Sequence, residues 1–292
     1  MPNLAVKVKE TIIGTIKGTG EIVDAVTETV SGSLTKAVKG TGDVGRTLTG
    51  AAADVATGVI QGTSQVGANL GEATKGTVIG VLQGAKEIGE NALDAVSSTV
   101  ESLVRTTVEV GGDVGTAAKQ AVVGSIEGAR SVGASAIDTV TAAATGAVQA
   151  VGNVGKATTA TAADVARGII QGTASVSGDL GAAAKGTLIG ALRGTKELST
   201  QSLETIGASA GSVVKTASDV GGDLGAAAKG AVEGAIAGAK EIGVDASEAA
   251  SAAATGTLKA AGDISKAAID EVRRVTTGVI SGVKVVAKEP FK

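Results

Sequence analysis

Hydrophobic and polar residues recur along this chain at every twenty-second position. With Gly14 as position 1, thirteen such repeats follow one another without insertion or deletion, and the last begins at Gly278. Positions 3 and 9 are aliphatic in every repeat. Twenty-two is twice eleven, and eleven residues in three turns give about 3.67 residues per turn, which is a helical period. Strands need a period of two, which these columns lack, so the pattern predicts amphipathic α-helices.

The repeat has one apolar face and one polar face when its positions are placed on this helical pitch. Valine, isoleucine, leucine, alanine, threonine and glycine fill the apolar arc, and charged residues fill the opposite arc, as Lys17 and Glu21 do in the first repeat. Lysine and arginine also gather at positions 7 and 18, on one border of the apolar arc. We interpret them as a solvated flank of the helix.

The array of repeats covers almost the whole chain. Residues 1–13 form a lead-in, residues 14–289 form the array and residues 290–292 form a short tail. A longer period of five repeats, or one hundred and ten positions, lies over the first, because A-A-A-D-V-A-T-G-V-I-Q-G-T from Ala51 matches T-A-A-D-V-A-R-G-I-I-Q-G-T from Thr161. Duplication of a block of five repeats is the natural origin of this longer period.

Two arrangements of the helices are compatible with the pattern. The two prolines, Pro2 and Pro290, lie outside the array, so no proline breaks it. Softer breaks are expected at residues 110–115, 177–181 and 220–225, where a glycine can end one helix and an aspartate can cap the next. The predicted fold is therefore all-α, either one long rod or helices of roughly 40 residues folded back as hairpins or a bundle.

Glycine is unusually frequent for a helical chain, with 45 residues. At about 0.8–1 kcal/mol each relative to alanine, they cost roughly 40 kcal/mol, which packing must offset. Many recur as G-x-x-x-G at positions 1 and 5, and in most repeats glycine or serine also holds position 10, inside the apolar arc. Small residues at this spacing let two helices approach closely. The glycines predicted to pack helices are Gly14, Gly18, Gly58, Gly62, Gly80, Gly84, Gly89, Gly124, Gly128, Gly133, Gly168, Gly172, Gly190, Gly194, Gly234, Gly238, Gly243, Gly278 and Gly282.

Composition argues against most chemistry. Histidine, cysteine, tryptophan and tyrosine are absent, and Phe291 is the one aromatic residue. Cysteine–histidine and serine–histidine–aspartate catalysis and conventional zinc sites therefore cannot be built. The dinucleotide-binding pattern at residues 40–45 lacks the preceding strand that such a site needs. We expect no enzyme activity, cofactor, metal or small-molecule substrate.

Charge and hydropathy limit the partners. The net charge is −3 and no basic patch is present, so nucleic acid is not an expected partner. The first residues show no signal peptide, and the longest uncharged runs are too weakly apolar to span a membrane. We expect a cytoplasmic protein.

Two segments carry a family resemblance: A-T-K-G-T-V-I-G-V-L-Q-G-A-K-E from Ala73 and A-A-A-K-G-T-L-I-G-A-L-R-G-T-K-E from Ala182. The chain resembles the synuclein, perilipin and apolipoprotein class of eleven-residue helical repeats. This resemblance implies a chain that is disordered in water and helical on lipid.

The leading hypothesis is a non-enzymatic structural protein that packs helices through small residues, within one chain or between copies as a scaffold, rod or filament. The alternative is a coat that folds on a lipid or membrane surface. A third hypothesis is a protectant of the late-embryogenesis type. The glycines inside the apolar arc favour helix–helix contact over lipid, since they reduce the apolar area that a lipid surface would bury.

Overall fold

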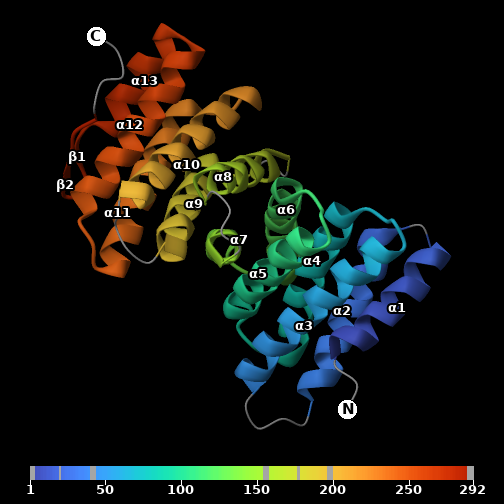
Figure 1. Cartoon of the computed structure of the whole chain (residues 1–292). Helices are drawn as coiled ribbons and strands as arrows, with labels where there is room; N and C mark the ends of the chain where they lie inside the picture. Colours follow the sequence, from blue (N-terminus) through green and yellow to red (C-terminus); the bar gives the residue numbers. More distant parts are fainter. Residues whose placement is uncertain are drawn as a thin grey trace. The chain divides into compact units, whose positions relative to one another are not determined.

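A computed structural model describes residues 4–19, 21–39, 44–153, 158–175, 178–195 and 200–287. These residues form thirteen helices and one small hairpin, so the all-α prediction is confirmed (Figure 1). The chain divides into two compact units, residues 1–154 and residues 155–292. Each unit is a stack of short helices with the character of a helical repeat protein.

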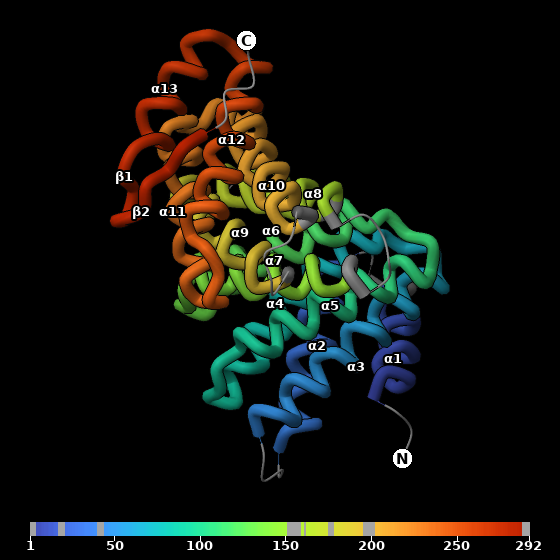
Figure 2. Tube along the Cα trace, turned by 60° about the vertical axis from the view of Figure 1, so that its left-hand side comes forward, coloured from blue at the N-terminus to red at the C-terminus, as the bar shows by residue number. Residues whose placement is uncertain are grey.

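Unit 1 contains two layers of helices. Its helices are α1 (Leu4–Thr19), α2 (Ile22–Val38), α3 (Val44–Gln65), α4 (Leu70–Ile88), α5 (Leu93–Glu109), α6 (Val114–Val132) and α7 (Ala136–Asn153). Each helix packs most extensively against the second helix along the chain, so that α1, α3, α5 and α7 form one layer and α2, α4 and α6 the other. The first of these layers can be followed in Figure 2.

Unit 2 has the same arrangement. Its helices are α8 (Thr158–Ser175), α9 (Leu180–Thr195), α10 (Thr200–Asp219), α11 (Leu224–Ile242), α12 (Ala246–Ile264) and α13 (Lys266–Thr276). Helices α8, α10 and α12 form one layer and α9 and α11 form the second, and α13 packs against both α11 and α12. Val214, Ala228, Leu258 and Val272 meet in the core between the two layers.

Many of the helices end at position 10 of the repeat. Gly67, Gly89, Gly111, Gly133, Gly221 and Gly243 all hold this position, and all have a positive φ between 66° and 82°. A left-handed residue ends a helix, and only glycine adopts that conformation freely. The continuous rod is therefore not formed, and the helices contain 11–22 residues rather than about 40.

Position 12 starts the next helix two residues later. Asn69, Asp113, Asp223 and Asp245 are N-caps whose side chains accept hydrogen bonds from backbone amides of the following first turn. The breaks predicted at residues 110–115 and 220–225 are thus present. Because the turn itself occupies fixed positions of the repeat, the register continues undisturbed through it.

The core is built from small aliphatic residues and threonine. Ile12, Leu34, Leu82 and Ile236 are among the largest side chains that are fully buried. Many buried threonines satisfy their hydroxyl groups locally, and Thr77 for example donates to the carbonyl oxygen of Ala73 at 2.7 Å. This i−4 hydrogen bond lets threonine present its methyl group to the core without an unpaired polar atom.

The last repeat forms strands in place of the helix that the register predicts. Strands β1 (Gly278–Ile280) and β2 (Val283–Val285) pair antiparallel, with Ile280 opposite Val283. The two-residue turn is Ser281–Gly282, with φ of 50° and 78°, which suits a tight hairpin turn. β-Branched residues replace the alanines of other repeats here, and the hairpin packs on α12.

Candidate functional site

Several of the predicted glycines lie in close contacts between helices of one layer. A Cβ atom on Gly80 in α4 would lie 2.7 Å from the carbonyl oxygen of Thr27 in α2. A Cβ atom on Gly62 in α3 would lie 3.0 Å from the carbonyl oxygen of Lys9 in α1. Gly58 makes a tighter contact with α1, and Gly84 makes an ordinary van der Waals contact with α2. A larger residue at the tight positions would push the two backbones apart, so these glycines set the spacing of the helices.

The same contacts recur farther along the chain. Cβ atoms on Gly124 and Gly128 in α6 would lie 2.6 Å from the carbonyl oxygen of Lys75 and from Leu82 Cδ1 of α4, respectively. In unit 2, Gly234 of α11 lies against the backbone of Lys185, and a Cβ atom on Gly238 would lie 2.9 Å from Leu192 Cδ1. The backbone contacts of Gly124 with Lys75 and of Gly128 with Ile79 have the same sequence offset of 49 residues. The contacts of Gly234 with Lys185 and of Gly238 with Ile189 have this offset too, so the two helices of each pair run in the same direction.

The other predicted helical glycines have varied surroundings. Gly168 and Gly172 in α8 and Gly190 in α9 are buried, and Gly194 in α9 is half-buried. Gly14 and Gly18 lie in α1. A Cβ atom on Gly14 would meet nothing within 4 Å, so this glycine does not hold two helices together in the folded chain.

Gly89, Gly133 and Gly243 do not pack helices. They are the left-handed C-caps of α4, α6 and α11, and a Cβ atom on any of them would meet nothing within 4 Å. The prediction placed them inside the apolar arc of a continuous helix. The chain instead reverses there, because a positive φ breaks the helical hydrogen-bond ladder at the position where each arc would continue.

Gly278 and Gly282 also lie outside the helices. Gly278 begins β1, with φ of 98°, and Gly282 occupies the hairpin turn. Their G-x-x-x-G spacing matches that of the helical repeats. The surrounding V-I-S-G-V-K-V sequence favours strands, because β-branched residues on both sides of a serine–glycine pair form a hairpin.

Other glycines make contacts of the same kind but were not predicted. Gly76, Gly146, Gly230 and Gly256 lie against backbone atoms of the preceding helix in their layer. Gly146 and Gly256 hold position 1, but an alanine replaces glycine at position 5, so the G-x-x-x-G criterion passed over them. The position-1 column taken alone would have found both.

The first helices of unit 1 carry polar residues where inner helices carry buried ones. Thr11 is exposed and Thr15 half-buried in α1, whereas Val55 and Val59, two repeats later in α3, are buried. Lys36, the one residue at position 1 of a repeat that is neither glycine nor serine, is exposed in α2. Polar residues at these positions are typical of the outer face of a stack, since a terminal repeat has no neighbouring repeat to cover it.

A groove with a volume of about 850 Å³ lies on the α8, α10 and α12 layer of unit 2. Its lining includes Gly207 and Gly211 of α10 and Gly256 of α12, and Val286 borders it. In unit 1, five repeats earlier, Ser97 and Glu101 replace Gly207 and Gly211. Because Gly207 and Gly211 have no side chains, they leave the groove on this layer of unit 2. They also let α10 pack closely against α12.

Charged residues line this groove in pairs whose members are two repeats apart. Glu204 and Glu248 lie toward the start of α10 and α12, Lys215 and Lys259 lie farther along, and Asp219 and Asp263 lie near the ends. All six are exposed. They give the groove an acidic, then basic, then acidic order along its length.

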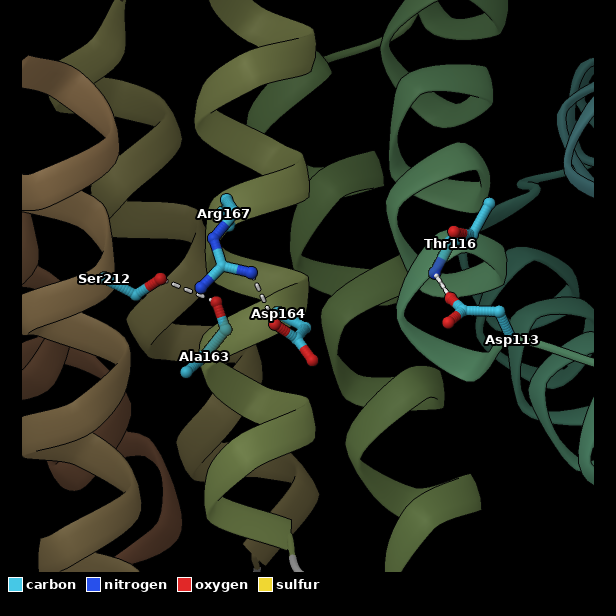
Figure 3. Close-up of polar contacts among 6 residues, drawn as sticks. All are labelled: Asp113, Thr116, Ala163, Asp164, Arg167 and Ser212. Atoms are coloured by element: carbon cyan, nitrogen blue, oxygen red, sulfur yellow. Dashed lines mark hydrogen bonds and ion pairs between the residues drawn. The ribbon is translucent and has the colours of Figure 1, made fainter. Parts of the chain in front are cut away.

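Polar contacts fix the edge of the groove on α8. Ser212 Oγ of α10 donates to the carbonyl oxygen of Ala163 at 2.7 Å, and Arg167 pairs with Asp164 at 2.7 Å (Figure 3). The sequence patterns did not predict these contacts. The groove itself was not predicted either, although the two-repeat spacing of its charges is visible in the sequence.

Asp113 is the one described residue with a resolved pKa shift. The backbone amide of Thr116 donates to its carboxylate, as drawn in Figure 3, and this bond, followed by the Thr116 side chain, holds the pKa of Asp113 below its ordinary value of 3.8. Slight burial acts in the opposite direction. The shift belongs to a helix cap, so its physical role is structural.

No protein family model matches the sequence, and no curated protein matches it significantly. Among the described residues, no group of three or more aspartate or glutamate side chains is placed to hold a metal ion. No helix in the described parts of the chain is both long and apolar enough to cross a membrane. The described residues show helical packing of the repeat type.

Proposed function

We propose that the chain is a non-enzymatic scaffold that acts by holding a stack of helices rigidly and presenting their outer faces. One observation carries this proposal: the glycines at repeating positions bring helices together within the chain, as Gly80 does with Thr27. Glycine is costly in a helix, so this spacing is maintained by tight packing that offsets the cost. A helical repeat stack of this kind offers extended surfaces for binding.

The polar surfaces of α1, α2 and α13 argue against the assembly of copies into rods or filaments. A filament needs uncovered faces that are complementary between the copies that join. Thr11, Thr15 and Lys36 make the first face of unit 1 polar, and α13 of unit 2 exposes Lys266, Asp270 and Arg274. Such faces suit contact with water. We therefore favour a single-chain scaffold over an assembled one.

Light scattering over a range of concentrations tests this choice. We expect the mass of one chain at all concentrations. The double substitution Thr11→Val and Thr15→Val gives α1 the valines that α3 has at the corresponding repeat positions. We expect it to promote self-association, because it creates an uncovered apolar strip. The matched control is Thr49→Val on α3, where the threonine hydroxyl makes an exposed hydrogen bond to Gly45. A wild-type mass that rises with concentration would contradict the single-chain form and favour the filament.

The lipid-coat alternative stays a prediction with its own test. In the described residues, the large hydrophobic side chains that are exposed are Val6, Ile137, Val220, Val279 and Val286. They are scattered over different elements, and the apolar arcs of the helices are buried against each other. These observations favour the scaffold over the coat. Circular dichroism in buffer should show full helicity, and a large gain on anionic vesicles would instead support the coat.

A further inference from the structure

Two parallel helices, α10 and α12, form most of the groove in unit 2. A Cβ atom on Gly207 would lie 3.3 Å from the carbonyl oxygen of Ala252, and one on Gly211 would lie 3.0 Å from that of Gly256. Both contacts have a sequence offset of 45 residues, so α10 and α12 run in the same direction. The groove therefore follows the axes of the two helices.

The charged residues of the groove form like-charged pairs across it. The three pairs are Glu204 and Glu248, Lys215 and Lys259, and Asp219 and Asp263. Each pair has a sequence offset of 44 residues, one less than the packing contacts, so its two members lie at the same height along the groove. Within the described residues, none of these six side chains is in an ion pair. A ligand with the opposite charge at each height would remove the repulsion within each pair.

The corresponding face of unit 1 carries only one complete row of these charges. On α5, the acidic, basic and acidic residues are present as Asp94, Arg105 and Glu109. On α7, the neutral residues Gln149 and Asn153 stand where α12 has Lys259 and Asp263. The second complete row thus occurs in the unit whose α10 has the two groove glycines. Since both features distinguish one copy of a duplicated block, they indicate that the groove and its charges serve one ligand.

The spacing of the charges along the groove fits a helical ligand. Lys215 follows Glu204 by 11 residues, or about 16 Å, and Asp219 follows Lys215 by four residues, or about 6 Å. An extended chain covers the first step in about five residues, which places the two charges on opposite faces. A helix covers the same steps in 11 and four residues, so all three charges lie on one of its faces.

We propose that the groove binds one amphipathic α-helix of a partner protein, whose charges are basic, acidic and basic at the three heights. The lysine pair holds the acidic residue of this helix, and the two acidic pairs hold its basic residues. Gly207, Gly211 and Gly256 let its backbone approach the groove closely. The inference rests on the scaffold proposal, because it names the partner of one outer face of the stack.

Synthetic alanine-rich peptides of about 20 residues, a length that forms helices in water, test the inference. One peptide carries lysine, glutamate and lysine at the spacing of the groove charges for a parallel helix, and a second carries them in reverse for an antiparallel helix. Fluorescence anisotropy of the labelled peptides measures binding. We expect one of the two to bind about tenfold tighter than the same peptide with lysine and glutamate exchanged. A central proline, which breaks the helix, should weaken its binding about tenfold.

Variants of the protein locate the binding in the groove. Lys259→Gln with Asp263→Asn gives α12 the residues of α7 and should weaken the better peptide several-fold. Lys215→Glu with Lys259→Glu should reverse the preference, so that a peptide with lysine in place of its glutamate binds tighter. The matched control is Lys266→Gln, because Lys266 is exposed on α13 and lies outside the groove, and it should change nothing. All these side chains are exposed, so circular dichroism should show an unchanged fold.

Four results would overturn the proposal: no binding of either peptide, equal binding of the charge-exchanged peptide, equal binding of the proline peptide, or an equal effect of Lys266→Gln. Such a failure is separate from a failure of the single-chain scaffold, which light scattering of the protein without peptide decides.

Discussion

Gly80 of α4 lies against the carbonyl group of Thr27 in α2, so closely that a Cβ atom would be 2.7 Å from the oxygen. The same atom would lie 2.7 Å from Val30 Cβ. Neither α2 nor α4 has room to yield, since the neighbouring Val26, Val30 and Leu34 are fully buried. This relationship shows how a chain without large aromatic residues forms a dense core: it brings the helix backbones together.

Substitution of Gly80 by alanine should lower the free energy of unfolding. The added methyl group forces α2 and α4 apart, and overpacking of this kind costs about 1–3 kcal/mol. Gly32 in α2 is the matched control, because a Cβ atom there would meet nothing within 4 Å. Gly32→Ala should stabilise the protein by up to about 1 kcal/mol through helix propensity. Thermal unfolding followed by circular dichroism measures both, and equal shifts of the same sign would contradict the packing role.

Substitution of Gly89 should affect the turn and leave the spacing of the layers unchanged. Its φ of 82° is left-handed, and an L-residue there costs about 1–2 kcal/mol. Gly89→Ala should therefore lower the melting temperature, and Gly89→Asn should lower it less, because asparagine tolerates this conformation better. Scattering should show an unchanged mass. Equal effects of alanine and asparagine would speak against a left-handed cap.

Removal of the Asp113 cap should destabilise α6. Asp113→Ala leaves the amide of Thr116 without its acceptor and should cost about 1 kcal/mol. The folded-state pKa of Asp113 is below its unfolded value, so its pH-dependent contribution is present above the unfolded value of 3.8 and is lost as pH falls through the folded pKa. Asp113→Asn keeps a cap and removes this dependence. Denaturant unfolding at neutral pH and in acid should separate the two variants, and identical pH profiles of wild type and Asp113→Asn would refute the assignment.

The helical class and much of the packing could be predicted from the sequence. The period of the repeat predicted amphipathic helices, and the G-x-x-x-G columns found Gly58, Gly80 and Gly234 at close contacts. The role of position 10 was predicted wrongly, because a glycine there, such as Gly89, is compatible both with the apolar arc of a continuous helix and with a left-handed C-cap. The signal that separates the two is the capping residue two positions later, as Asn69 is to Gly67 and Asp113 is to Gly111.

The hairpin and the groove were harder to predict for a different reason. Gly278 keeps the register of the repeats, which predicts a helix. The strand preference of the neighbouring β-branched residues overrides that prediction, and the repeat period alone does not report this preference. The groove depends on Gly207 and Gly211 in one helix and Gly256 in another. Its hollow exists only once α10 and α12 are packed, so no single segment of sequence contains it.

The distance between Thr35 and Glu87 tests the stacked arrangement most directly. Thr35 Oγ1 of α2 donates to Glu87 Oε2 of α4 at 3.0 Å, although 52 residues separate them. The chain has no cysteine, so Thr35→Cys and Glu87→Cys provide two unique sites for spin labels. In buffer without lipid, dipolar spectroscopy should show the two labels as close neighbours. A separation on the order of 80 Å, which a continuous helix between the two sites would give at about 1.5 Å per residue, would contradict the stack.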